Sequence, residues 1–290
     1  MNKVVSKISI IFLLLISRLP MVIHYWFSNF LYILLFKIVK YRKKVVLKNI
    51  EIVYPSHSKS QKTELARNYY LYLSQLIVEV VKGFTISKKE LQKRISVDNL
   101  NIYDELFNKN QSAIVALGHN GNWEWICRHA SMVSKHKLYV AYKPLSNPFF
   151  DKLMAKTRTA FGMQQIAMNN VGRFIIEHKN EAFLLILISD QKPSNPKNGI
   201  WVDFFKTKTS FLPGLEKLSL KYNLPIYFHE VKRVKRGYYR CKIHHLLNPL
   251  DYQKEGSITQ KYARHLEKMI VEQPETWLWS HNRFKHKFDI

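Results

Sequence analysis

The stretch that most constrains this chain is residues 112 to 126, which read SAIVALGHNGNWEWI. Its apolar part, Ala113 to Leu117, is typical of a buried strand. Gly118 ends that run, and the residues from Trp123 to Ile126 indicate the start of a packed helix. A strand that turns into a helix places the turn at the carboxyl edge of a sheet, where open α/β folds bind ligands. The free N–H groups of the new helix point to the same place.

Two residues of this turn, His119 and Glu124, offer a specific chemistry. A histidine with an ordinary pKa near 6.5 can accept a proton at neutral pH. A carboxylate bonded to one ring nitrogen fixes the tautomer, so that the other nitrogen can take a proton from a substrate hydroxyl. The spacing alone is also typical of a helix-capping turn with a structural histidine, because about one such pair is expected by chance in this composition.

Composition narrows the class of protein. The 290 residues suffice for one large α/β domain or two small ones, and a hydrophobic content of 47% excludes disorder. The net charge of +25 implies an anionic partner, which could be nucleic acid, an anionic membrane, or an acidic protein or substrate. Cys127 and Cys241 fit neither a disulfide framework nor a metal motif, so we expect two reduced core thiols.

The N-terminal segment, residues 8 to 36, is strongly apolar but interrupted by Arg18 and Pro20. We expect a membrane-embedded anchor made of a helix, a break and a second helix in the interface. One tilted transmembrane helix, a signal peptide and two buried helices of a soluble protein remain as alternatives. The following stretch, Lys37 to Lys48, contains basic residues and no acid, which fits either contacts with anionic headgroups or a solvated basic face.

The rest of the chain alternates predicted helices with predicted strands. A strand at 182–189 is apolar on both faces, as in the middle of a covered sheet, and it leads into Asp190 and Gln191 at another carboxyl edge. The sequence therefore predicts an α/β fold with a central, mostly parallel sheet flanked by helices, after N-terminal membrane-anchoring helices. The other predicted helices lie at 58–82, within 97–109, from 149 onward, at 211–222 and at 257–271, and the other predicted strands at 138–142, 225–231 and 239–245.

The turn sequence GHNGNWE resembles the His-x4-acid signature of the glycerolipid acyltransferase superfamily. It is most similar to the version found in the lipid A biosynthesis acyltransferases, the lauroyl/myristoyl transferase family. Four other blocks, one before this turn and three after it, match that family in the right order. They are YRKKVVLKNIEIVYP at 41–55, YKPLSNPFF through Arg158 and Gly162 at 142–163, Asp190-Gln191, and PETWLWSHNRFK at 274–285. The chain departs from the family at Lys206, where a glycine is usual.

The resemblance implies a glycerolipid-acyltransferase-like fold that transfers a fatty acyl chain from a thioester, usually on acyl carrier protein, to a hydroxyl of a lipid A precursor. His119 would be the general base and Glu124 would orient it. Asn122, Arg158, Asp190 and Gln191 would bind substrate, with Arg158 holding a donor phosphate or the developing oxyanion. Asp190 would hold either an active-site residue or the acceptor. No metal and no other cofactor would be needed.

The same resemblance implies a protein of the cell inner membrane. Residues 1–48 would form the anchor and the basic juxtamembrane segment, and residues 49–290 a catalytic domain facing the cytoplasm. The basic turn Lys232 to Gly237 is a candidate docking site for an acidic carrier protein, although a solvated turn would look the same. Trp277 and Trp279 are expected to serve packing.

Two alternatives remain from the sequence. The enzyme could acylate another acceptor, such as an aminolipid, a glycerolipid or a pigment. A different class is a non-enzymatic basic protein that binds membranes or nucleic acid. The basic residues are spread through the chain, and the Pro- and Gly-marked blocks have no role in such a protein, so we expect an enzyme with no nucleic-acid partner.

Overall fold

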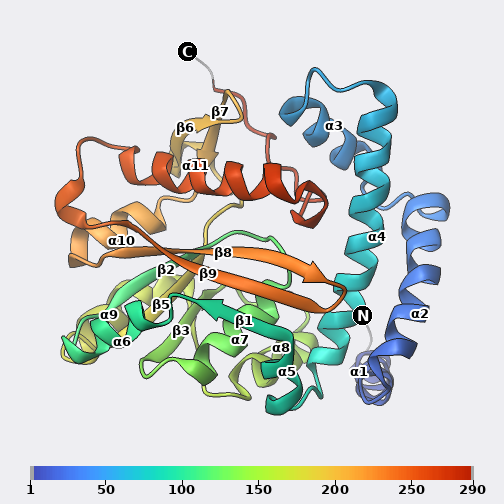
Figure 1. The fold of residues 1–290 in the computed structure, drawn as a ribbon, viewed down its shortest axis with the longest axis horizontal. Coiled ribbons are helices and arrows are strands. Elements are labelled where there is room, and N and C mark those ends of the chain that lie inside the picture. Colours follow the sequence, from blue (N-terminus) through green and yellow to red (C-terminus); the bar gives the residue numbers. More distant parts are fainter. Residues whose placement is uncertain (1–2, 289–290) are drawn as a thin grey trace.

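A seven-stranded sheet forms the centre of the computed structural model, which describes residues 3–288 (Figure 1). The strand order is β1-β9-β8-β2-β5-β3-β4, in which β9 and β1 run opposite to the other five strands. This confirms the predicted α/β fold with a mostly parallel sheet. The strands are β1 (Ile95–Asp98), β2 (Ala113–Leu117), β3 (Lys137–Tyr142), β4 (Gln164–Ala167), β5 (Phe183–Ile188), β8 (Ile226–Lys235) and β9 (Tyr238–Leu247).

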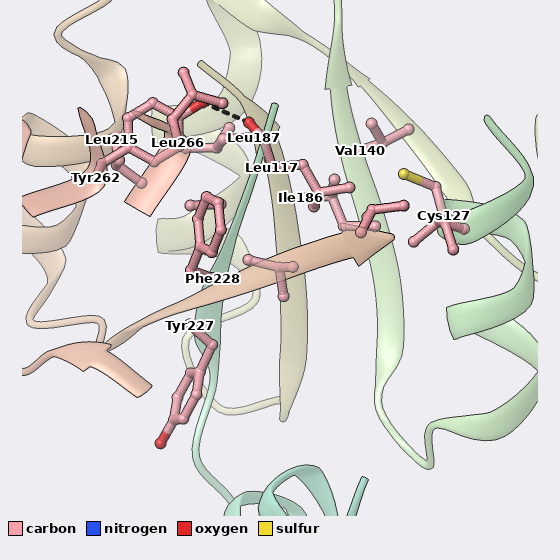
Figure 2. Packing of buried hydrophobic residues seen from close by; sticks show 14 of the residues in the cluster. Leu117, Cys127, Val140, Ile186, Leu187, Leu215, Tyr227, Phe228, Tyr262 and Leu266 are labelled. Carbon is pink, nitrogen blue, oxygen red and sulfur yellow. Dashed lines mark hydrogen bonds between the residues drawn. The ribbon is translucent and has the colours of Figure 1, made fainter. Parts of the chain in front are cut away.

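Helices cover both faces of this sheet. The strands β2 and β5 are almost fully buried, as their unbroken apolar sequences predict. Leu215 and Leu266 lie on one side of these strands and Cys127 on the other (Figure 2). The helices are α3 (Lys43–Val53), α4 (Lys59–Gly83), α5 (Lys88–Arg94), α6 (Asn101–Asn108), α7 (Trp123–Val133), α8 (Pro148–Thr159), α9 (Val171–Glu177), α10 (Gly214–Tyr222) and α11 (Ser257–Glu272).

The N-terminal segment forms two helices with a break between them, as predicted. Helix α1 spans Lys3–Ser17, and α2 spans Met21–Tyr32 and continues as a π-helical segment to Ile38. The stretch Met21–Ile38 is long and apolar enough to cross a membrane. Its outer side chains are strongly exposed, with Trp26 at 70%. Such a contiguous apolar surface argues against the alternative of two buried core helices.

Helix α4 connects these N-terminal helices to the sheet. Ser58 and Gln61 form a capping box at its start, with hydrogen bonds of 3.2 and 2.7 Å, which explains why the helix begins at Lys59. The helix lies between α2 and the sheet (Figure 1). Helix α3 also packs on it and runs across residue 48, where the basic segment was expected to end.

Two of the predicted segments have different bounds in the structure. Strand β8 extends to Lys235, so most of the turn predicted at 232–237 belongs to the strand. Only residues 236–237 form the tip of this long hairpin. Residues 200–211 form a second hairpin of β6 (Ile200–Phe204) and β7 (Thr207–Phe211), so the helix predicted from 211 begins only at Gly214. Lys206 adopts a φ of 57°, a conformation that glycine adopts most readily, so the turn forms without the glycine that the family usually has.

Candidate active site

Hydrogen bonds from the core fix the last residue of β2, directly before the turn that carries His119. The carbonyl oxygen of Leu117 accepts hydrogen bonds from the Tyr262 hydroxyl at 2.6 Å (Figure 2) and from the Ser189 N–H at 3.2 Å. Gly121 has a φ of 60°, and a Cβ atom there would lie 2.6 Å from Cγ1 of Val231. A larger residue at position 121 would therefore displace the turn that carries His119.

The C-terminal segment from Pro274 to His281 straps this turn in place. The Leu278 N–H donates to the His119 carbonyl at 3.1 Å, and the Gly121 N–H donates to the Thr276 carbonyl at 3.2 Å. The strap is fixed in turn by Asn49 of α3, whose amide donates to the carbonyls of Trp279 at 2.8 Å and His281 at 2.7 Å. Two of the blocks that resemble the acyltransferase family thus meet around the His119 turn.

His119 and Asp190 form the central pair of the site. The register of β2 and β5 pairs Leu117 with Ile188, so both residues emerge side by side from the same sheet edge. Nδ1 of His119 lies 2.5 Å from Oδ1 of Asp190, and the His119 backbone N–H donates to Oδ2 at 2.8 Å. Nδ1 therefore carries the proton, and Nε2 is left as an acceptor, 3.3 Å from the amide nitrogen of Gln191.

Asp190 is held in its ionised form. The Trp277 indole N–H also donates to Oδ2, at 2.9 Å. Although burial raises the pKa of this carboxyl, its attraction to His119 and the hydrogen bonds from His119 and Trp277 outweigh burial and lower the pKa to about 2. The carboxylate can therefore fix the imidazole and stabilise its charged form.

Among the described residues, Glu124 makes no hydrogen bond to His119, whereas the sequence predicted that it would orient the imidazole. Its carboxylate accepts two hydrogen bonds from Arg158 of α8, from Nε at 2.9 Å and from Nη2 at 2.5 Å. Glu124 lies in the first turn of α7, which packs against α8, and Asp190 already occupies Nδ1 of His119. Burial lowers the pKa of Arg158, but the bonds to Glu124 outweigh it and raise the pKa above its usual value. The carboxylate that lies next to the imidazole of His119 in this structure is therefore that of Asp190.

Asn122 also differs from its expected place as a substrate-binding residue. Its side chain is fully buried, with Oδ1 accepting from the Trp125 N–H at 3.1 Å and the amide donating to Glu79 at 3.0 Å. The same Glu79 carboxylate accepts from the hydroxyls of Tyr25 at 3.0 Å and Tyr239 at 2.6 Å. Asn122 therefore caps α7 and ties the turn to α4, with neither polar group left for a substrate.

A pocket of about 900 Å³ opens beside His119. Glu124, Arg158 and Gln191 line it with His119, while Asp190 and Asn122 lie behind its wall. A volume of this size suits an elongated ligand, and apolar walls suit a hydrocarbon chain. The apolar part of the wall includes Cys127, Val140, Met163, Ile188 and Leu212.

The ionisable residues of the pocket wall include a cysteine and two lysines. Burial raises the pKa of Cys127 to about 12, so its thiol stays protonated and is a poor nucleophile. Lys143 and Lys192 are the lysines among the described lining residues. The basic hairpin does not line this pocket. Its Lys232 is paired with Glu230 and Glu272, at 3.0 and 2.6 Å, and its Arg236 stacks over Tyr25 of α2.

The sequence interpretation missed the hydrogen bond of Trp277, and it did not say which active-site residue Asp190 would hold. Trp277 does pack, as predicted, but its indole also bonds to the catalytic-site carboxylate. The pairing had a signal in the sequence, since two buried strands, ending at Leu117 and Ile188, are each followed two residues later by a polar residue, His119 and Asp190. Such strands are candidates for neighbours in a parallel sheet. The Trp277 contact had none, because it joins residues 87 positions apart.

Comparisons with known proteins identify the family of this chain. The family described as bacterial lipid A biosynthesis acyltransferase matches residues 2–286. A lipid A biosynthesis acyltransferase of Haemophilus influenzae is 22% identical over 276 residues, which cover 94% of this chain and 85% of that protein. Two Escherichia coli proteins, a lipid A biosynthesis myristoyltransferase and a palmitoleoyltransferase, are 20% and 22% identical, with 83% and 85% of this chain and 74% and 80% of those proteins covered. The chain belongs to the bacterial lipid A biosynthesis acyltransferases.

Proposed function

We propose that this acyltransferase moves a fatty acyl chain from an acyl thioester to a hydroxyl of a lipid A precursor, with His119 as general base and Asp190 as the residue that orients it. The observation that carries the proposal is the 2.5 Å contact between Asp190 and Nδ1 of His119, which leaves Nε2 unprotonated and next to the pocket. The relatives named as myristoyl- and palmitoleoyltransferases of lipid A biosynthesis support the fatty acyl chain and the acceptor.

The proposed reaction has two steps. Nε2 of His119 takes the proton of the acceptor hydroxyl while the hydroxyl oxygen attacks the thioester carbonyl, which forms a C–O bond and a tetrahedral oxyanion. The C–S bond then breaks, and the leaving thiolate takes the proton back from the imidazolium. Glu124 occupies two of the five N–H donors of Arg158, and the others remain for the oxyanion or for an anionic group of the donor.

The proposed acyl donor is acyl carrier protein. The net charge of +25 favours an acidic protein partner, and Lys143 and Lys192 bring positive charge to the pocket that would take the thioester. The hairpin tip, by contrast, packs against α2 through Arg236 and against α5 through Gly237. We therefore propose that the carrier protein docks around the pocket rather than on the hairpin.

We also expect the protein to lie in the cell inner membrane with its catalytic domain facing the cytoplasm.

A charge-reversal experiment tests the docking site. Lys143→Glu with Lys192→Glu should lower kcat/KM for the carrier-protein donor by about tenfold or more and weaken its dependence on salt. With a short pantetheine thioester as donor, the difference in kcat/KM between this variant and the wild type should be far smaller. The matched control is Lys235→Glu with Arg236→Glu on the hairpin. A larger loss of carrier-dependent activity in the hairpin variant would return the docking site to the hairpin.

The reaction itself is tested by incubating the full-length protein, in detergent and lipid, with acylated carrier protein and a lipid A precursor. Mass spectrometry should detect a lipid heavier by one acyl chain, and His119→Ala should abolish it without loss of folding. A folded His119→Ala protein with undiminished turnover would refute the general base. Acylation of an aminolipid or glycerolipid, but not of the lipid A precursor, would refute the acceptor.

A further inference from the structure

A groove separate from the catalytic pocket lies between the N-terminal helix α1 and helix α8. It has a volume of about 360 Å³, and its floor is apolar, with Leu14 from α1 and Phe149 and Leu153 from α8. Three lysines also line it: Lys7 on α1, and Lys152 and Lys156, one helical turn apart, on α8. No carboxylate lines the groove among the residues that the structure describes, so the lysine charges are not neutralised within it.

The surroundings of the groove are those of a membrane contact. Ile8, Phe12 and Leu15 lie on the outer face of α1 and are 61, 62 and 55% exposed. An apolar groove that carries unneutralised ammonium groups, beside an exposed apolar helix face, fits an amphiphile with hydrocarbon chains and a negative headgroup. A soluble anion would leave the apolar floor uncovered, and an acidic protein or a nucleic acid would bring no hydrocarbon to it.

We propose that this groove is a binding site for an anionic phospholipid of the bilayer, with the headgroup phosphate at Lys7, Lys152 and Lys156 and an acyl chain along Leu14 and Leu153. This goes beyond the acyl-transfer function, because the lipid is a ligand and not a substrate. It also differs from the basic segment at 37–48, which lies on other elements.

The groove is connected to the catalytic pocket through α8. The same helix carries Arg158, which lines the catalytic pocket two residues after Lys156. At its other end, the Asn147 amide donates to the Ser6 hydroxyl of α1 at 3.3 Å. A lipid that bridges α1 and α8 would therefore fix the helix that positions Arg158.

Native mass spectrometry of the full-length protein in detergent, with added phosphatidylglycerol or phosphatidylcholine of the same acyl chains, tests the site. The wild-type protein should retain phosphatidylglycerol at lower concentrations than phosphatidylcholine. Lys7→Gln, Lys152→Gln and Lys156→Gln combined keep polar, unbranched side chains but remove the charges, and should reduce this preference by about tenfold or more. Ile11→Trp, which fills the groove but keeps the lysines, should also reduce the phosphatidylglycerol retained.

The matched control replaces three exposed lysines of α10 and α11, Lys217, Lys261 and Lys268, by glutamine, and should retain the wild-type preference. His119→Ala should also bind normally, so failure of the catalytic proposal would not affect this test. The proposal is wrong if the groove and control variants lose the preference equally, or if the wild type shows no preference. Lysine-dependent retention of a phosphorylated lipid A precursor, but not of phosphatidylglycerol, would make the groove an acceptor site and would equally overturn the proposal.

Discussion

At the scale of single residues, the site has two carboxylates with different partners. Asp190 bonds to the ring of His119, while Glu124 bonds to Arg158. A sequence that places Glu124 five positions after His119 suggests a direct contact, but in the structure that side chain bonds to Arg158 of α8. Asp190 is distant in sequence, yet the parallel pairing of β2 and β5 brings it next to the imidazole.

The lowered pKa of Asp190 predicts a pH-dependent contribution to stability. The folded-state pKa of about 2 lies below the ordinary value of 3.8, so the ionised carboxylate stabilises the fold above about pH 4. This contribution, on the order of 2 kcal/mol, should disappear as the pH falls from about 4 to about 2. Unfolding of wild-type protein and Asp190→Asn in detergent, as a function of pH, measures it. A difference between the two proteins that stays constant down to pH 2 would contradict the lowered pKa.

At the scale of elements, the structure joins four segments around one buried carboxylate. Glu79 of α4 accepts hydrogen bonds from α2, from β9 and from the His119 turn. The sequence predicted α4 and its apolar periodicity, but not Glu79, because a single acid on a helix with many buried positions is ordinarily assigned to the solvent face. The partners of Glu79 are 43 to 160 residues away, a distance at which sequence spacing carries no information.

Glu79→Gln tests this junction. The amide has one acceptor oxygen for three donors, so we expect a loss of about 1–3 kcal/mol in unfolding free energy. The looser Asn122 turn should also lower kcat, with little change in KM because Glu79 does not line the pocket. Glu64→Gln, at an exposed position of the same helix, is the matched control and should leave both quantities unchanged. If Glu79→Gln lowers stability but leaves kcat at the wild-type value, Glu79 has a structural role alone.

At the scale of the whole molecule, the chain places an α/β domain beside two apolar helices. Element types and the mostly parallel sheet could be predicted from the sequence, because buried strands and amphipathic helices leave strong local patterns. The order of strands, the edge strand β1 and the path of the C-terminal strap could not, since they depend on contacts between distant segments. The packing of the basic hairpin against α2 could not be predicted either, because it also joins distant segments.

The exposed face of α2 predicts how the protein associates with membranes. Val22, Trp26 and Phe30 are 79, 70 and 62% exposed, and burying each in lipid should contribute about 1.5–3 kcal/mol. The protein should therefore remain in the membrane fraction at 1 M salt, which shortens the Debye length to about 3 Å. Replacing the three residues by serine should release folded protein into the soluble fraction. Complete release of the wild type by salt alone would show that surface charge is sufficient.

The most direct test of the central claim compares kcat for Asp190→Asn and Glu124→Gln with that of the wild type, using acylated carrier protein and a lipid A precursor at saturation. If Asp190 orients His119, Asp190→Asn should lower kcat on the order of 10²–10⁴-fold and approach the activity of His119→Ala. Glu124→Gln should keep most of kcat and mainly raise KM, because it loosens Arg158. A near wild-type kcat for Asp190→Asn, together with a loss in Glu124→Gln as large as that of His119→Ala, would contradict the account and identify Glu124 as the orienting carboxylate.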